Sequence, residues 1–234
     1  MPFFYYYGGY FNYYLFMLPG IIVTLWASIR VRSTFRKYSS FDNSRGLTGA
    51  DAARAVLSQY GVDGVRVERV SGNLTDHYDP RTNVIRLSES VYDSRSVAAI
   101  GVAAHEAGHA AQYAANYRPV KWRTALVPIC NLGSQLALPL LIFGSILNFY
   151  GLMVAGIALF SFSVLFQLVT LPVEFNASRR ALKAIEDRDL LYGDEYVAAR
   201  KTLSAAAMTY VAALFQSLLS LLYFVLRASG SRRR

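Results

Sequence analysis

Four stretches of the chain are apolar over the roughly 20 residues that a helix needs to cross a bilayer. They lie at about residues 11–29, 126–147, 152–173 and 205–226. The middle two come from a block, residues 124–173, that contains no Lys, Arg, Asp or Glu and is interrupted at Asn148–Gly151. The pattern therefore predicts about four transmembrane helices, the second and third forming a hairpin.

A polar region between the first two apolar stretches carries the signals of a small mixed domain. Thr48 and Asp51 mark the start of a helix that ends before Gly61, and Ser96 marks the start of another that runs to about Tyr117. The expected strands are the alternating segment Val62–Val70 and the short segment Val84–Leu87, which follows a turn at Asp79–Asn83. We expect a small α+β domain here.

These elements divide the chain into five segments. We expect an N-terminal transmembrane anchor at 1–29, a polar α+β domain at 30–123, a two-span hairpin at 124–173, a polar helical segment at 174–204, and a last transmembrane helix with a basic tail at 205–234. The first segment lacks a basic start and a clear cleavage site, so it is interpreted as a retained anchor.

Composition supports the membrane interpretation. Apolar residues make up 54% of the chain and charged residues only 17%, against about 25% charged in soluble domains. The net charge is +9, and the basic residues cluster beside the apolar stretches, where they suit lipid headgroups. We therefore expect membrane lipids as partners and no nucleic acid. Cys130, the single cysteine, lies in an apolar run and is interpreted as a core residue.

The distribution of Lys and Arg predicts an orientation. Basic residues follow the first span, precede the second and follow the third, whereas the hairpin tip has none. This predicts a multi-pass protein of the cell membrane with its N-terminus outside and both polar segments, 30–123 and 174–204, in the cytoplasm. The tail, with Arg227 and Arg232–Arg234, disagrees if the last stretch crosses; we favour crossing because C-terminal charges are weaker determinants. The tyrosines at 5, 6, 7, 10, 13 and 14 suit an interfacial aromatic belt.

Residues 105–109 read His-Glu-Ala-Gly-His, the H-E-x-x-H pattern. Residues four apart share one face of a helix, so His105 and His109 can offer two imidazole nitrogens to one ion. Glu106 can then act as the base for a zinc-activated water. The pattern also arises by coincidence in other chains, but here it lies on an expected helix and uses two of the three histidines. We expect one Zn²⁺ per chain.

A tetrahedral site needs a third protein ligand. Glu174 is the best candidate because it is the first charged residue after the uncharged block, and two crossings return the chain to the same face. The alternative interpretation is an interfacial carboxylate at the end of a span.

Four segments together resemble the YugP-type membrane zinc metallopeptidase family, from about Tyr38 to Leu226. They are VSGNLTDHYDPRT (70–82), VIRLSE (84–89), AAHEAGHA (103–110) and LPVEFNASRRA (171–181). More distantly the chain is similar to the HtpX and CAAX prenyl protease group. The resemblance implies a zincin-like (gluzincin) domain with His105, His109 and Glu174 as ligands and Glu106 as base. Those distant relatives carry an Asp, supporting a histidine, where this chain has Ser178.

Two further residues are candidates for substrate or oxyanion contacts. His77 precedes the Val84–Leu87 strand, which in zincins tends to run along the cleft and pair with substrate; otherwise it holds a turn. Tyr210 begins the last span and could aim a hydroxyl at the oxyanion; otherwise it is an interfacial aromatic.

The sequence thus predicts a membrane-anchored zinc metalloendopeptidase acting on protein or peptide substrates at the membrane surface. One alternative is an intramembrane zinc protease, although burying the polar side chains of residues 96–117 in lipid would be costly. Another is a non-catalytic membrane scaffold with a structural zinc. The sequence does not indicate an oligomeric state.

Overall fold

The computed structural model describes residues 2–231, and the side chains of residues 2–12, Ser134, Gly230 and Ser231 fall outside that description. The described residues form seven helices and a three-stranded sheet. The chain divides into two compact units: unit 1 comprises Met1–Ala27, Trp122–Leu171 and Thr209–Arg234, and unit 2 comprises Ser28–Lys121 and Pro172–Met208. The side chains predicted for the aromatic belt at 5, 6, 7 and 10, and tail residues Arg232–Arg234, lie outside the described residues.

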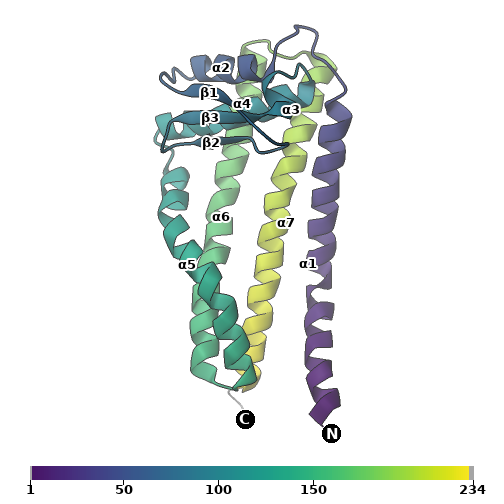
Figure 1. Ribbon diagram of the computed structural model, residues 1–234, viewed down its shortest axis with the longest axis vertical. Helices are drawn as coiled ribbons and strands as arrows, with labels where there is room; N and C mark the ends of the chain where they lie inside the picture. Colours follow the sequence, from purple (N-terminus) through teal and green to yellow (C-terminus); the bar gives the residue numbers. More distant parts are fainter. Residues whose placement is uncertain (1, 232–234) are drawn as a thin grey trace. The chain divides into compact units, whose positions relative to one another are not determined.

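Unit 1 consists of the apolar parts of four long helices. They are α1 (Pro2–Tyr38), α5 (Arg118–Ile146), α6 (Tyr150–Asp187) and α7 (Gly193–Ser231) (Figure 1). Within residues 2–231, these four are the helices long and apolar enough to cross a membrane. The expectation of four apolar spanning helices is therefore confirmed as far as length and composition can decide it.

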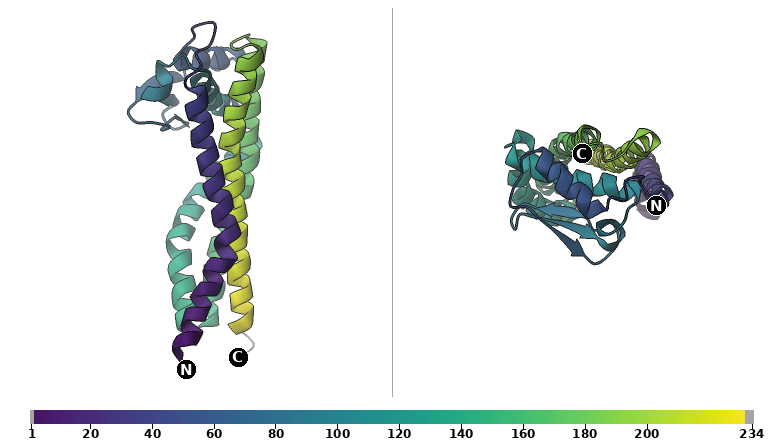
Figure 2. Two further views of the ribbon diagram at one scale, coloured as in Figure 1. Left: turned by 90° about the vertical axis from the view of Figure 1, so that its right-hand side faces the viewer. Right: turned by 90° about the horizontal axis from the view of Figure 1, so that it is seen from above.

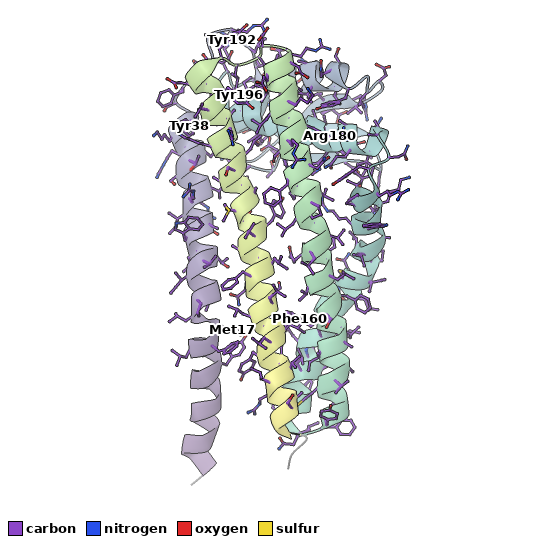
Figure 3. All side chains as sticks on the ribbon, turned by 180° about the vertical axis from the view of Figure 1, so that it is seen from behind. Met17, Tyr38, Phe160, Arg180, Tyr192 and Tyr196 are labelled. Carbon is purple, nitrogen blue, oxygen red and sulfur yellow. The ribbon has the colours of Figure 1, made fainter. Side chains whose placement is uncertain are left out.

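Aromatic and amide contacts join the helices of unit 1. The rings of Tyr13 on α1 and Tyr223 on α7 have centroids 4.8 Å apart, and Gln216 Nε2 on α7 donates to Met17 Sδ on α1 at 3.4 Å. Figure 2 shows α1 and α7 side by side. Phe160 on α6, labelled with Met17 in Figure 3, contacts Phe224 on α7 with ring centroids 5.9 Å apart.

The break predicted at Asn148–Gly151 is confirmed. Helix α5 ends at Ile146 and α6 begins at Tyr150. Asn148 has φ 49°, in the left-handed region that asparagine tolerates better than most residues. The uncharged block therefore forms two helices rather than one.

Unit 2 contains the sheet, of order β1-β3-β2 (Figure 1). β1 (Arg66–Val70) pairs in parallel with β3 (Val84–Ser88), and β2 (His77–Asp79) pairs antiparallel with the other edge of β3. Val84, Ile85 and Leu87 are fully buried. β3 is thus the central strand, with both edges paired, so the zincin tendency for this strand to pair with substrate does not hold here; β1 and β2 are the two edge strands.

Two capped helices pack together in unit 2. α2 (Gly49–Gln59) begins with a capping box between Thr48 and Asp51, and α4 (Val97–Ala114) begins at the N-cap Ser96, whose hydroxyl accepts from the Ala99 N–H. Both starts were predicted. The small alanines of α4 lie in one core with Val56, Leu87 and other apolar side chains of unit 2. α3 (Glu89–Tyr92), which the sequence did not predict, links the sheet to α4.

The structure thus confirms a mostly helical chain with four apolar helices and a small sheet. The zincin-like character of unit 2 and its cytoplasmic location stay predictions, as do the five segment boundaries.

Candidate metal centre

Three predicted ligands meet in unit 2. The imidazoles of His105 and His109 lie on one face of α4, with ring centroids 4.7 Å apart. The Glu174 Oε2 atom lies 3.3 Å from His105 Nε2 and 3.6 Å from His109 Nε2. One ligand atom from each residue lies within 4.8 Å of the other two. The sequence spacing on α4 and the exit of α6 from the apolar block bring these side chains together.

Close contact between α4 and α6 allows the three candidate ligands to meet. Gly108 lies between the two histidines, and a Cβ added there would stand 2.5 Å from the Ala177 carbonyl oxygen on α6. Ala177 is itself fully buried. Because glycine has no side chain, α6 can approach until Glu174, one turn earlier, reaches the histidines.

The cluster fits zinc in both chemistry and spacing. Two imidazole nitrogens and one carboxylate oxygen are a known catalytic zinc set, and ligand atoms about 2.0–2.2 Å from a tetrahedral ion lie about 3.3–3.6 Å apart. The measured separations of 3.3 and 3.6 Å match this range. They are longer than the roughly 2.7–3.2 Å of a good N–H···O hydrogen bond. The donors therefore suit a shared ion better than direct pairing.

The site is buried but reachable. The Glu174 side chain is 3% exposed, whereas those of His105 and His109 are 15% and 12% exposed. The carboxylate is thus enclosed by protein, whereas the two imidazole side chains keep a small exposed fraction. Three protein ligands leave the fourth position of a tetrahedral ion without a protein ligand, which is the arrangement of catalytic rather than structural zinc sites.

Glu106 faces the edge of the sheet. The Tyr78 N–H in β2 donates to Glu106 Oε2 at 3.0 Å. Burial raises the pKa of Glu106, and the nearby carboxylates of Glu174 and Asp76 raise it further; His105 and the Tyr78 N–H oppose this without cancelling it. A carboxylate with a raised pKa is a stronger base, which is what proton transfer requires.

Asp76 anchors the strand that holds Glu106. Its Oδ1 atom accepts from the Ser88 backbone N–H at 2.7 Å and from the Ser88 hydroxyl at 3.0 Å. Ser88 is fully buried at the end of β3. Burial nevertheless raises the pKa of Asp76 above its ordinary value. These bonds fix the start of β2 and thereby the position of the Tyr78 N–H.

Each histidine also has a partner at its other ring nitrogen. His105 Nδ1 lies 3.1 Å from the Ser178 hydroxyl, and His109 Nδ1 lies 3.1 Å from Gln112 Oε1. Ser178 therefore does contact a histidine, at the position where the distant relatives carry an Asp. Such outer partners orient the ring and fix which nitrogen faces the metal.

The remaining two candidates lie outside this cluster. His77 is exposed, and its Nδ1 atom lies 2.8 Å from the Thr75 carbonyl oxygen in the preceding turn. This local contact agrees with the turn-holding alternative, and a substrate contact stays a prediction. Tyr210 lies on α7 in unit 1, so its oxyanion role also stays a prediction.

Sequence reasoning missed Gln112 and Tyr78. A signal existed for Gln112, which is the polar residue three positions after His109 in an alanine-rich helix. Tyr78 acts through its backbone N–H, which every residue except proline carries, so its side chain gave no signal.

The donor set and the four apolar helices are those expected of a membrane-associated zinc peptidase. Residues 13–229 match the family described as "Putative neutral zinc metallopeptidase", and the chain belongs to that family. This bears out the resemblance drawn from the four sequence segments.

A similar protein with a name of its own supports this family assignment. The protein of Bacillus subtilis (strain 168) named "Putative membrane protease YugP" is 48% identical to this chain over 204 residues, which cover 87% of this chain and 91% of that protein. No solved structure gives a significant match.

Proposed function

We propose that this protein is a membrane-anchored zinc metalloendopeptidase that hydrolyses peptide bonds of protein or peptide substrates at the membrane surface. The observation that carries the proposal is the convergence of His105, His109 and Glu174, with Glu106 held beside them by the Tyr78 N–H. Family membership and the name of the Bacillus subtilis relative support it.

His105, His109 and Glu174 would hold one Zn²⁺. Bound there, zinc would supply Lewis acidity, which lowers the pKa of water to about 7 and polarises a carbonyl oxygen. The ligands themselves carry one negative charge from Glu174 and none from neutral imidazoles. A site of this kind keeps a net positive charge, as Lewis acidity requires.

Glu106 would be the general base. It takes a proton from the attacking water and delivers it to the amine that leaves when the C–N bond breaks. The single Tyr78 N–H contact on Oε2 positions the carboxylate, and its Oε1 atom is the one left to face the reacting water. The raised pKa of Glu106 makes it a better base than an ordinary carboxylate.

The edge of β2 that faces away from β3 gives the substrate a place to lie. One edge of β2 pairs with β3, and the Tyr78 N–H points from the opposite side towards Glu106. An extended peptide can add to such an edge through its backbone. We therefore place the substrate backbone along β2, next to the active helix α4.

The protein would lie in the cell membrane as a multi-pass protein with unit 2 in the cytoplasm. The support is the excess of Lys and Arg beside the apolar helices and its absence from the hairpin tip. In the described part of the chain, α4 is not among the helices apolar and long enough to span a membrane. This favours a site at the surface over the intramembrane alternative.

The test compares the unaltered protein with Glu106→Gln, purified in detergent and loaded with zinc. Peptide hydrolysis should fall by about 100-fold or more, because the base is lost, while zinc content stays at one ion per chain, because Glu106 is not a ligand. Glu186→Gln, at an exposed glutamate of α6, is the matched control and should retain full activity. Hydrolysis by Glu106→Gln within tenfold of the parent would remove Glu106 from the mechanism. A parent that binds zinc and cleaves nothing would instead support the scaffold alternative.

A further inference from the structure

We infer that Gln112 is a positioning residue. Its single amide group orients the ring of His109 and the backbone next to Glu174, two of the proposed ligands; the inference rests on the proposed metal site. Its Oε1 atom lies 3.1 Å from His109 Nδ1. Its Nε2 atom donates at 2.7 Å to the carbonyl oxygen of Val173, the residue before Glu174. One side chain thus contacts the ring of one ligand and the backbone that carries another.

The Val173 carbonyl fixes the orientation of the amide. A carbonyl oxygen can only accept, so the NH₂ group of Gln112 must face it and the amide oxygen must face His109. That oxygen can also only accept, so His109 Nδ1 must carry the proton. In the neutral imidazole, the form that binds a metal, the lone pair of His109 is therefore on Nε2, the nitrogen 3.6 Å from Glu174 Oε2. The tautomer that a metal needs is set before any metal binds.

His105 lacks this constraint. Its Nδ1 partner is the Ser178 hydroxyl at 3.1 Å, and a hydroxyl can donate or accept. Ser178 can therefore accompany either tautomer of His105. The two histidines differ in this respect: Gln112 organises His109 in advance, whereas His105 is free to adopt its tautomer when the metal arrives.

A second hydrogen bond connects Gln112 to α6. Gln112 Nε2 also donates to Asn176 Oδ1 at 3.0 Å, and the same oxygen accepts from Arg180 Nε at 2.9 Å. Arg180, labelled on α6 in Figure 3, lies with its guanidinium 5.4 Å from the ring centroid of Tyr60. The Tyr60 hydroxyl in turn donates to the Arg180 carbonyl oxygen at 2.9 Å. The turn of α6 that carries Glu174 is thereby tied to α4.

Burying the side-chain amide of Gln112 costs free energy unless its polar atoms are hydrogen-bonded. Its side chain is fully buried on a helix whose other buried residues are apolar, most of them alanine. A buried amide must find partners for its oxygen and its NH₂ group, and here the partners are His109 on one side and α6 on the other. An apolar residue would fill the same space without fixing either element.

The experiment uses two variants of the full-length protein. Gln112→Met keeps the approximate volume and removes both polar contacts. Gln112→Glu keeps an acceptor for His109 but turns the NH₂ donor into an oxygen that faces the Val173 carbonyl. Gln59→Met, at a partly exposed glutamine of α2, is the matched control.

Two measurements follow. Zinc affinity, from competition with a chromogenic chelator, should fall by about 10–100-fold in both Gln112 variants and stay unchanged in Gln59→Met. Nitrogen NMR of the metal-free protein should show His109 protonated at Nδ1 in the parent and in Gln59→Met, and a tautomer mixture in Gln112→Met. A purely structural role would not alter the tautomer of an otherwise folded protein.

The outcomes separate this inference from the proposed function. If Gln112→Met keeps both the parent's zinc affinity and the Nδ1–H tautomer, Gln112 does not position the ligand. If the unaltered protein takes up no zinc, the proposed function fails, and the tautomer in the metal-free protein still decides the role of Gln112.

Discussion

Gly108 on α4 lies against the backbone of Ala177 on α6, so closely that a methyl group at Gly108 would stand 2.5 Å from the Ala177 carbonyl oxygen and 3.4 Å from its Cα. The obstacle is backbone rather than a flexible side chain, so one of the two helices would have to move. Both carry ligands within one turn of the contact. The metal site therefore depends on the absence of a side chain at position 108.

Gly108→Ala should consequently weaken zinc binding by about tenfold or more, and lower the free energy of unfolding by about 1–3 kcal/mol through overpacking. Gly101→Ala on the same helix is the control, because its added Cβ would meet its nearest neighbour, Ala199, at 3.6 Å, an ordinary contact. Chelator competition and thermal unfolding in detergent measure both effects. Equal zinc affinity in the two variants would show that the close approach does not set the site.

Local signals in the sequence were sufficient to predict the helices and the shared face of the two histidines. The caps at Thr48 and Ser96 and the break near Asn148 are each encoded by the residues at those positions, and the structure has them there. The spacing of His105 and His109 fixes their common face as soon as the segment is helical.

Features that depend on contacts between distant segments were harder to predict. β2 has three residues, too few for alternation to stand out, and its place at the edge depends on pairing with β3. The partners of Gln112 lie 61 and 64 residues further along the chain. A buried glutamine gives no clue in sequence about which backbone carbonyl it will reach. Glu174 was predicted because the apolar block before it limits where the chain can return.

The orientation can be tested with single cysteines in a Cys130→Ser background. Arg81→Cys and Glu186→Cys lie in the same compact unit, so both should react only with thiol reagents that reach the cytoplasm. Phe149→Cys, between α5 and α6, should react only from outside. Labelling of intact and permeabilised cells with a membrane-impermeant maleimide makes the comparison. Opposite sides for positions 81 and 186 would separate the histidines from Glu174, and the metal site could not form.

The capping box of α2 should give a measurable pH dependence. The Thr48 hydroxyl donates to Asp51 Oδ2 at 2.6 Å and the Thr48 backbone N–H donates to it at 3.0 Å, and these bonds lower the pKa of Asp51. Because the folded pKa lies below the unfolded value of about 3.9, the stabilisation is present above that pH and is lost as pH falls through the folded pKa.

Asp51→Asn should therefore be less stable than the parent by about 0.5–1 kcal/mol at pH 7, and the difference should shrink as the pH falls below about 4. Thermal unfolding in detergent across this pH range gives the comparison, with Asp63→Asn at an exposed position as the control. A difference that stays constant down to pH 3 would show that the carboxylate charge plays no part in the cap.

Glu174 should be the third zinc ligand, and Glu174→Ala should lower zinc affinity by about 100-fold or more, beyond the 10–100-fold typical of residues that only support a ligand. Its side chain is 3% exposed, and its Oε2 atom lies 3.3 Å from His105 Nε2, so the carboxylate already stands where a third ligand is needed. Glu186, three turns further along the same helix, is exposed and provides the matched control. Zinc per chain is measured by mass spectrometry after dialysis against a weak chelator. Glu186→Ala should keep one ion per chain, whereas Glu174→Ala should lose it. Circular dichroism of both variants checks that the helices remain, because loss of zinc from an unfolded chain says nothing about ligation. A folded Glu174→Ala protein that retains its zinc as firmly as the parent would place the third ligand elsewhere and refute the His105, His109 and Glu174 site.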